Sequence, residues 1–170
     1  MKQELETLDK FEHPHIVRVI DLCEDNQNIY IVSELMRHGT LTQMLTKIQE
    51  TRASFTEKDC ANLVYQMIIA VNFLHKQDVI HRDLKLDNIM VDLERIDDHS
   101  TTMICKVTDF GFAKTMDRDK KETLSLGTPL YMAPELVTRR PYDSKVDIWA
   151  LGVITHIILT GIPPHNGRGK

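Results

Sequence analysis

Cysteine is scarce in this chain, and its spacing argues against two kinds of structure. Cys23, Cys60 and Cys105 are the three cysteines, an odd number with no CxxC pair and no adjoining histidine cluster. Disulfide scaffolds and structural zinc sites both need such pairs. We therefore expect neither, and a reducing compartment, the cytoplasm or the nucleus, as the location.

Long apolar runs and an excess of positive charge are also missing. The segment Met1 to Lys10 is charged and has no apolar core of a signal peptide. The longest apolar stretch, Ile148 to Ile162, covers 15 residues and contains His156, which is short for a membrane span. With 21 Lys and Arg against 25 Asp and Glu, the net charge is −4. We therefore expect neither a membrane nor nucleic acid as a partner.

The hydrophobic pattern near the N-terminus predicts a helix followed by a hairpin. Apolar residues recur at helical spacing over Gln3–Phe11, and His13-Pro14 ends this run because proline disfavours helix in the residue before it. Two β-rich runs, Ile16–Ile20 and Ile29–Val32, are joined by a polar turn. This arrangement indicates an antiparallel pair of strands.

The rest of the chain mixes helices with short strands. Apolar residues at a 3.6-residue period predict three helices: Leu41–Gln49, Glu57–His75 and Lys145–Thr160. Thr56 is a suitable N-cap for the second of them. Three short β-rich pieces are also expected: Val79–Ile80, Ile89–Val91 and Met103–Val107. The polar segment Asp92–Thr102 predicts a solvated hairpin loop.

Two polar motifs follow predicted strands and carry the chemistry of the chain. They are His81-Arg-Asp-Leu-Lys-Leu-Asp-Asn88 and Asp109-Phe-Gly111. Together they supply a carboxylate that can accept a hydroxyl proton, a cation that can offset phosphate charge, and two oxygen ligands for Mg²⁺. These side chains are, in the same order, Asp83, Lys85, Asn88 and Asp109. Phosphoryl transfer needs this set, because positioning and charge neutralisation supply most of its catalysis.

In order and spacing, these motifs resemble those of the eukaryotic protein kinases. They are followed by Gly127-Thr-Pro-Leu-Tyr-Met-Ala-Pro-Glu135 and Asp147-Ile-Trp-Ala-Leu-Gly152, as in that family. The resemblance implies an α+β, protein-kinase-like fold that is mostly the helical C-lobe. Residues 1–36 would be an N-lobe remnant with the hinge, and residues 37–170 a C-lobe without its later helices.

The resemblance also implies a reaction and the roles of its residues. Asp83 would be the catalytic base, and Lys85 would contact the transferred phosphate. Asn88 and Asp109 would bind Mg²⁺. ATP and Mg²⁺ would be the cofactors, and a protein with a Ser or Thr acceptor the substrate, since kinases acting on Ser/Thr carry a lysine where this chain has Lys85. Thr128 would tie the substrate-binding loop to Asp83 and Lys85.

Further residues match the nucleotide pocket of the family. Glu34-Leu35-Met36 resembles the hinge, so backbone groups of Glu34 and Met36 would bond adenine, with Met90 as an apolar floor. Glu4 matches a helix glutamate that pairs with a strand lysine. Because the sequence lacks that lysine, an exposed helix carboxylate is the alternative interpretation.

Regulation is implied by the same resemblance. Arg82 would be the cation that docks a phosphorylated activation segment, with an ordinary surface ion pair as the alternative. Thr123 and Ser125 flank Leu124, which stands at the position usually phosphorylated. An upstream kinase would modify one of them, or both stay unmodified loop hydroxyls. The segments HRDLKLDNIMVD and KVTDFGFAK look most like the calcium/calmodulin-dependent-kinase-like group.

Two of the family's contacts to the ATP phosphates are missing. No GxGxxG motif precedes the first helix, since the first glycine is Gly39, and there is no strand lysine. At the other end, Ile148–Leu159 is apolar on almost every face and would be partly uncovered. Three interpretations stay open: an incomplete piece of an active Ser/Thr kinase, a catalytically silent binding or regulatory module, or a fold completed by a second chain. The intact HRD, Asn88 and DFG favour the first.

Overall fold

The computed structural model describes four stretches of the chain: residues 11–53, 55–97, 100–115 and 122–165. The predicted first helix and Glu4 within it lie outside these stretches, apart from Phe11. The ring of Phe11 packs edge-on against Phe73, with 5.6 Å between ring centroids. The described residues form a mixture of α-helices and two-stranded antiparallel sheets.

The predicted N-terminal hairpin is present, with a later start. β1 (Val19–Glu24) pairs antiparallel with β2 (Ile29–Ser33). The residues before β1 pair elsewhere: Ile16 forms a parallel bridge with Val107, and the Val17 N–H donates to the Val107 carbonyl at 2.9 Å. This pairing joins the hairpin to the rest of the molecule, and it is why the first strand begins three residues later than the β-rich run.

Two of the predicted helices begin at threonine caps. α2 (Leu41–Thr51) follows Thr40, and α3 (Glu57–Lys76) follows Thr56. The Thr56 hydroxyl accepts from the Asp59 N–H at 3.2 Å, and the Asp59 carboxylate accepts from the Thr56 N–H at 2.8 Å. This reciprocal capping box satisfies two N–H groups that have no partner inside the helix. The prediction of Thr56 as an N-cap is confirmed.

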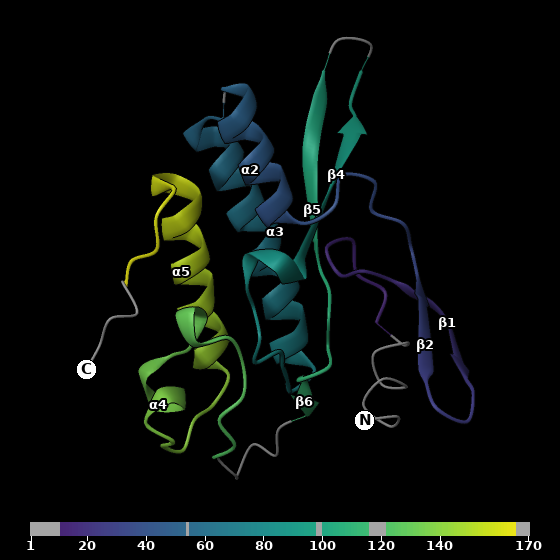
Figure 1. The fold of residues 1–170 in the computed structure, drawn as a ribbon, viewed down its shortest axis with the longest axis vertical. Coiled ribbons are helices and arrows are strands. Elements are labelled where there is room, and N and C mark those ends of the chain that lie inside the picture. The colour runs from purple at the N-terminus through teal and green to yellow at the C-terminus, as the bar shows by residue number, and fades with distance from the viewer. Residues whose placement is uncertain (1–10, 54, 98–99, 116–121, 166–170) are drawn as a thin grey trace.

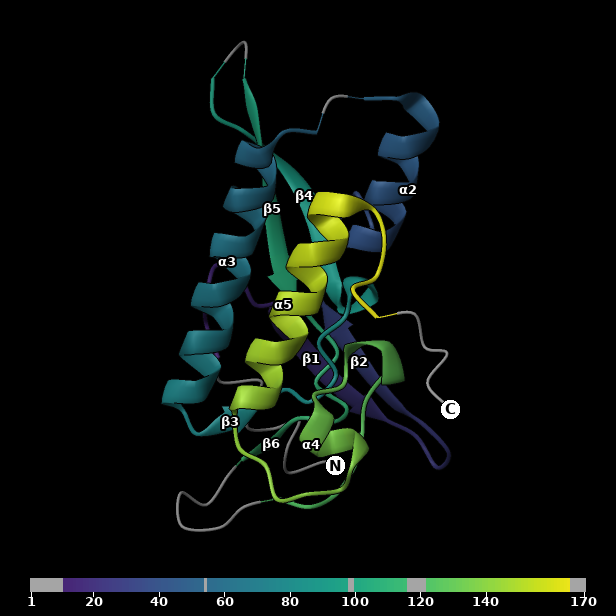
Figure 2. The same cartoon turned by 90° about the vertical axis from the view of Figure 1, so that its left-hand side faces the viewer.

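The core lies between α3, α5 (Lys145–Thr160) and the sheet next to them. Figure 1 shows α3 and α5 side by side along the long axis, and Figure 2 shows the same neighbours from another direction. Fully buried apolar side chains fill the contact: Leu63, Met67, Leu74 and Ile154. Each such side chain contributes about 1.5–3 kcal/mol to folding.

One face of α5 is partly uncovered in the described chain, as expected for a C-lobe without its later helices. Ile148 is 48% exposed and Leu159 is 55% exposed. A helix that is apolar on every side is normally buried all round. Within the described stretches, no helix combines the length and apolarity needed to cross a membrane.

The prediction of a polar loop over Asp92–Thr102 is wrong for most of this segment, because the flanking strands continue into it. β4 (Ile89–Arg95) pairs with β5 (Thr101–Val107) through every position from Ile89↔Val107 to Arg95↔Thr101. Polar residues at the exposed end of an antiparallel pair keep the backbone ladder, which does not depend on side-chain polarity. Figure 1 shows this ribbon between α3 and the β1–β2 hairpin, extending beyond the helices.

Short elements then position the polar motifs. β3 (Val79–Ile80) pairs with β6 (Lys114–Thr115), and the 3₁₀ turn η1 (Leu86–Asn88) leads directly into β4. The later segment contains the 3₁₀ turn η2 (Pro129–Tyr131) and the single-turn helix α4 (Pro134–Val137), both opened by proline.

Candidate active site

The loop that follows β3 has a strained backbone that one buried carboxylate supports. Arg82 has a φ of +68°, a left-handed conformation that costs a residue with a Cβ of order 1–3 kcal/mol. Asp147 at the start of α5 is 1% exposed and accepts the backbone N–H groups of His81 and Arg82, each at 2.9 Å. His75 of α3 approaches the same carboxylate at 2.8 Å. The loop is therefore anchored to two core helices.

His81 joins this loop to the second polar motif. Its Nδ1 accepts from the Asp83 N–H at 3.3 Å, so the ring proton sits on Nε2, which donates to the Thr108 carbonyl at 3.0 Å. The ring also packs against Phe110, with 5.1 Å between ring centroids. The side chain is completely buried, so the two motifs have a fixed relative position.

Four of the predicted site residues lie together around the Asp83 carboxylate. Asp83 is 3% exposed. Its Oδ1 accepts both the N–H and the hydroxyl of Thr128, at 2.9 and 2.8 Å. Its Oδ2 accepts from Lys85 Nζ at 2.6 Å and from Asn88 Nδ2 at 3.2 Å. Lys85 Nζ also donates to the Thr128 hydroxyl at 3.3 Å, so a cation and a hydroxyl hold one carboxylate between them.

The charge of Lys85 is stabilised by this arrangement. The hydrogen bond to Asp83 holds the pKa of the Lys85 ammonium above its ordinary value, and it outweighs the opposing effect of burial. The negative charge of Asp109 also contributes to raising this pKa, which places Asp109 within electrostatic reach of the ammonium. A charged lysine at this position can offset the charge of a phosphate group.

Asn88 and Asp109 are brought together by the start of the β4–β5 pair. The Thr108 N–H donates to the Asn88 carbonyl at 3.0 Å, so Asp109 follows the residue bonded to Asn88. Asp109 has a φ of +60° and is exposed, and its Oδ1 accepts the Gly111 N–H at 3.3 Å.

These two side chains fit a magnesium ion by the chemistry of their donors. Asn88 Nδ2 donates to Asp83, which leaves the amide oxygen of Asn88 for a metal. Asp109 adds a carboxylate oxygen. Mg²⁺ takes hard oxygen ligands and completes its six-coordinate shell with water and substrate phosphates. Among the described residues no group of three His, Cys, Asp or Glu side chains gathers around a common point, so such an ion would depend on those added ligands.

The predicted hinge lies between β2 and α2. Both carboxylate oxygens of Glu34 accept hydrogen bonds from Lys106 Nζ of β5, at 2.7 Å for Oε1 and 2.8 Å for Oε2. Burial acts to raise the pKa of Glu34, but the Lys106 ammonium and the Arg18 N–H outweigh it and hold the pKa below its ordinary value. Met36 is 7% exposed. Met90 is half-buried and forms an antiparallel β-bridge with Thr40, the N-cap of α2.

Arg82 pairs with a carboxylate that directly precedes the predicted hydroxyls in the sequence. It lies 3.9 Å, NH1 to Oε2, from Glu122, whose carboxylate is also paired with Lys114. Thr123 is exposed. The Ser125 hydroxyl donates to the Leu136 carbonyl at 2.8 Å.

Sequence reasoning missed Glu122 and Lys114. Both are ordinary charged residues in a polar segment, and they become neighbours of Arg82 only through pairing between distant segments: β6 with β3, and Glu122 with Tyr142. The one sequence signal was the position of Glu122 just before the predicted phosphosites.

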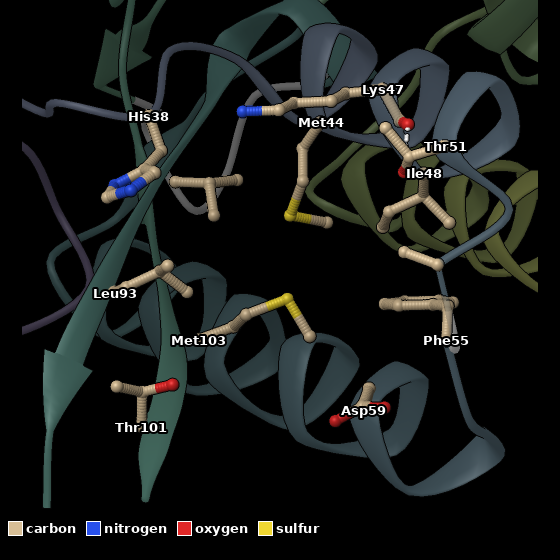
Figure 3. A pocket seen from close by; sticks show the side chains of 12 residues that line it. His38, Met44, Lys47, Ile48, Thr51, Phe55, Asp59, Leu93, Thr101 and Met103 are labelled. Atoms are coloured by element: carbon tan, nitrogen blue, oxygen red, sulfur yellow. Dashed lines mark hydrogen bonds between the residues drawn. The ribbon is translucent and has the colours of Figure 1, made fainter.

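A separate hollow of about 440 Å³ lies away from these residues, between α2, α3 and the β4–β5 ribbon. Figure 3 shows Met44 and Ile48 of α2 facing Met103 and Leu93 of the ribbon across it. Of the predicted site residues that the structure describes, none lines this hollow. It is therefore distinct from the candidate active site.

Comparison with known proteins agrees with this arrangement. A sequence model described as the protein kinase domain matches residues 1–170. The chain belongs to the protein kinase family. The predicted α+β kinase-like fold is thereby confirmed. The relatives described next confirm the resemblance to the calcium/calmodulin-dependent-kinase-like group.

Individual relatives among the protein kinases are similar along nearly the whole chain. Calcium/calmodulin-dependent protein kinase type 1 of Caenorhabditis elegans is 38% identical over 164 residues, which cover 96% of this chain and 44% of that protein. Myosin light chain kinase A of Dictyostelium discoideum is 37% identical over 167 residues, which cover 98% of this chain and 54% of that protein. The chain thus spans about half the length of these kinases.

Proposed function

We propose that the protein of which this chain is part is a serine/threonine protein kinase, transferring the γ-phosphoryl group of ATP to Ser or Thr hydroxyls of protein substrates. The observation that carries the proposal is the Asp83 carboxylate held between Lys85 and Thr128. The names of the relatives, calcium/calmodulin-dependent protein kinase and myosin light chain kinase, support the same class.

The geometry supports a specific division of roles. Asp83 accepts the proton of the acceptor hydroxyl while the bond from that oxygen to the γ-phosphorus forms and the bond from phosphorus to ADP breaks. Lys85, already charged, contacts the transferred phosphoryl group. Thr128 keeps Asp83 oriented through its N–H and hydroxyl. Asn88 and Asp109 would hold Mg²⁺, which would neutralise phosphate charge.

The remaining features of the proposal concern location and control. Backbone groups of Glu34 and Met36 bind adenine, with Met90 as an apolar floor.

Thr123 and Ser125 are candidate sites for an upstream kinase. Cys60 and Cys105 are buried thiols, and burial raises the pKa of Cys105 to about 12. Such inert thiols are compatible with a reducing compartment such as the cytoplasm.

A catalytically silent binding or regulatory module is the alternative to this proposal. Thermal unfolding of the full-length protein with and without Mg·ATP separates the two. The kinase proposal predicts that Mg·ATP raises the melting temperature and that Asp109→Asn removes the rise. A full-length protein whose melting temperature does not respond to Mg·ATP would support the binding module instead.

A further inference from the structure

Arg82 needs an anion, because its guanidinium is always charged and is almost entirely buried, with 8% of the residue exposed. Its Nε donates to the Phe112 carbonyl at 2.6 Å and its NH1 to the Tyr142 hydroxyl at 3.4 Å. Both of these acceptors are uncharged. The negative charge that pairs with the guanidinium is the Glu122 carboxylate, with 3.9 Å between Arg82 NH1 and Glu122 Oε2.

Glu122 uses both carboxylate oxygens in this pocket. Its Oε2 pairs with Lys114 and with Arg82. Its Oε1 accepts the backbone N–H groups of Thr123 and Leu124, at 2.9 and 3.2 Å. The side chain is only 13% exposed. The bond from Lys114, helped by these backbone donors, lowers the pKa of Glu122 to about 2, so the carboxylate is charged at any physiological pH.

The backbone of Glu122 is fixed as firmly as its side chain. Its N–H donates to the Tyr142 carbonyl at 3.3 Å, and the Tyr142 N–H donates to the Glu122 carbonyl at 2.9 Å. The Tyr142 hydroxyl donates to the Leu124 carbonyl at 2.8 Å. The segment that runs from Glu122 to Thr128, and so to Asp83, is therefore tied at its start to the same pocket as Arg82.

The two nearby hydroxyls are placed differently. Ser125 donates to the Leu136 carbonyl, and Thr123 is exposed and contacts Glu122 through its backbone N–H. A phosphate on Thr123 would bring a second anion next to a carboxylate that already pairs with Arg82 and Lys114, and a phosphate on Ser125 would remove its hydrogen bond to Leu136. Like charges in one site oppose each other.

We propose that the Glu122 carboxylate positions the segment from Glu122 to Thr128, here called the activation segment, against Arg82 and Lys114. Phosphotransfer then does not require phosphorylation of Thr123 or Ser125. The inference rests on the proposed kinase function and concerns its regulation. Glu122 acts through Arg82 and is a positioning residue, not a catalytic one.

The test uses full-length protein treated with a phosphatase and checked by mass spectrometry for the absence of phosphate. Wild type, Glu122→Gln, Glu122→Asp and Glu50→Gln are compared for phosphotransfer to a Ser/Thr peptide mixture. Glu50 is an exposed residue of α2 and is the matched control for the same chemical change. We expect active wild type and Glu50→Gln. We expect kcat to be at least about tenfold lower for Glu122→Gln, since a hydrogen bond to a charged group contributes about 1.5–3 kcal/mol.

Two further readouts separate positioning from a merely structural role. The KM for ATP stays unchanged in Glu122→Gln, because Glu122, Arg82 and Lys114 are not among the residues proposed to bind ATP. Glu122→Asp, which keeps the charge, recovers part of the lost kcat. If Glu122→Gln does not fold, Glu122→Asp still tests the role of Glu122, and the phosphatase-treated wild type still tests the requirement for phosphorylation.

The outcomes distinguish this inference from the proposed function. A phosphate-free wild type that binds Mg·ATP but gains activity only after phosphorylation of Thr123 or Ser125 overturns the inference and supports the kinase proposal. Equal kcat for wild type and a folded Glu122→Gln also overturns it. No phosphotransfer in either phosphorylation state overturns the proposed function, and the inference with it.

Discussion

Single buried polar groups fix the geometry of the loop after β3, which contains His81, Arg82 and Asp83. Asp147 and the completely buried His81 connect the loop to α3, α5 and the strand end at Thr108 through hydrogen bonds of 2.8 to 3.0 Å. Each removed partner leaves a buried donor unpaired, which costs about 1–3 kcal/mol. The strained φ of Arg82 persists because these bonds over-determine it.

Asp147→Asn should therefore destabilise the protein strongly. The amide places donors where the carboxylate accepts three N–H groups, so at least one of them loses its acceptor. We expect a loss of about 2–4 kcal/mol in the free energy of unfolding, measured with urea. Asp143→Asn, at an exposed residue that accepts one backbone N–H, is the control and should lose less than 1 kcal/mol. Equal losses for the two variants would contradict the anchoring role.

Thr128→Val should lower kcat without unfolding the protein. Valine keeps the branched shape and the backbone N–H bond to Asp83 but removes the hydroxyl that bonds both Asp83 and Lys85. We expect kcat to fall about tenfold, as one charge-assisted hydrogen bond is lost. Thr128→Ser retains the hydroxyl and should stay within about twofold of wild type in kcat. A similar fall for both variants would mean that the methyl group, and not the hydroxyl, is what matters.

The ion pair of Glu122 gives a pH dependence with a defined sign. Its folded pKa is about 2, below the ordinary value of 4.5. The stabilisation is therefore fully present above the unfolded pKa and is lost as pH falls through the folded one. The difference in unfolding free energy between wild type and Glu122→Gln should be constant above about pH 5 and shrink between pH 4.5 and 2. A difference that vanishes at pH 6 would contradict this pairing.

At the scale of elements, local signals were predictable from the sequence and long-range pairings were not. The cap at Thr56 and the bounds of α3 follow from neighbouring residues. The continuation of β4 and β5 to Arg95 and Thr101 does not, because the ladder forms between segments whose side chains are polar and exposed. The two polar motifs, residues 81–88 and 109–111, could be identified from the sequence because the residues of each are contiguous. The pocket around Arg82 could not, because it combines residues of separate segments.

Gly127 illustrates such a long-range requirement. Its φ is +117°, and a Cβ there would lie 2.6 Å from the Arg82 carbonyl oxygen. Both observations require glycine at this position, where the activation segment lies against the backbone of Arg82. Gly127→Ala should lower phosphotransfer by tenfold or more and destabilise the protein by about 1–3 kcal/mol. Urea unfolding and the kinase assay measure the two effects.

Gly152 is the matched control for this substitution. It lies within α5, and no atom outside its own helix turn lies within 4 Å of an added Cβ. Alanine is the better helix former by about 0.5–1 kcal/mol, so Gly152→Ala should leave stability unchanged or raised. A greater loss in Gly152→Ala than in Gly127→Ala would contradict the packing described for Gly127.

At the scale of the molecule, a helical core supports one polar site. α3 and α5 provide the buried foundation, the β4–β5 ribbon places Asn88 beside Asp109, and the activation segment returns to Asp83 through Thr128. The described chain leaves Ile148 and Leu159 of α5 and much of the β1–β2 hairpin exposed. Since the chain spans about half the length of its kinase relatives, experiments on activity belong on the full-length protein.

The central claim is tested most directly by identifying the amino acid that the full-length protein phosphorylates. The protein is incubated with Mg²⁺, γ-labelled ATP and a mixture of Ser, Thr and Tyr peptides, with Asp83→Asn as the control. We predict labelled phosphoserine or phosphothreonine, and a rate at least a hundredfold lower for Asp83→Asn, since general base catalysis contributes about 10²–10⁴-fold. Phosphotyrosine as the main product, or an Asp83→Asn variant as active as wild type, would contradict the account.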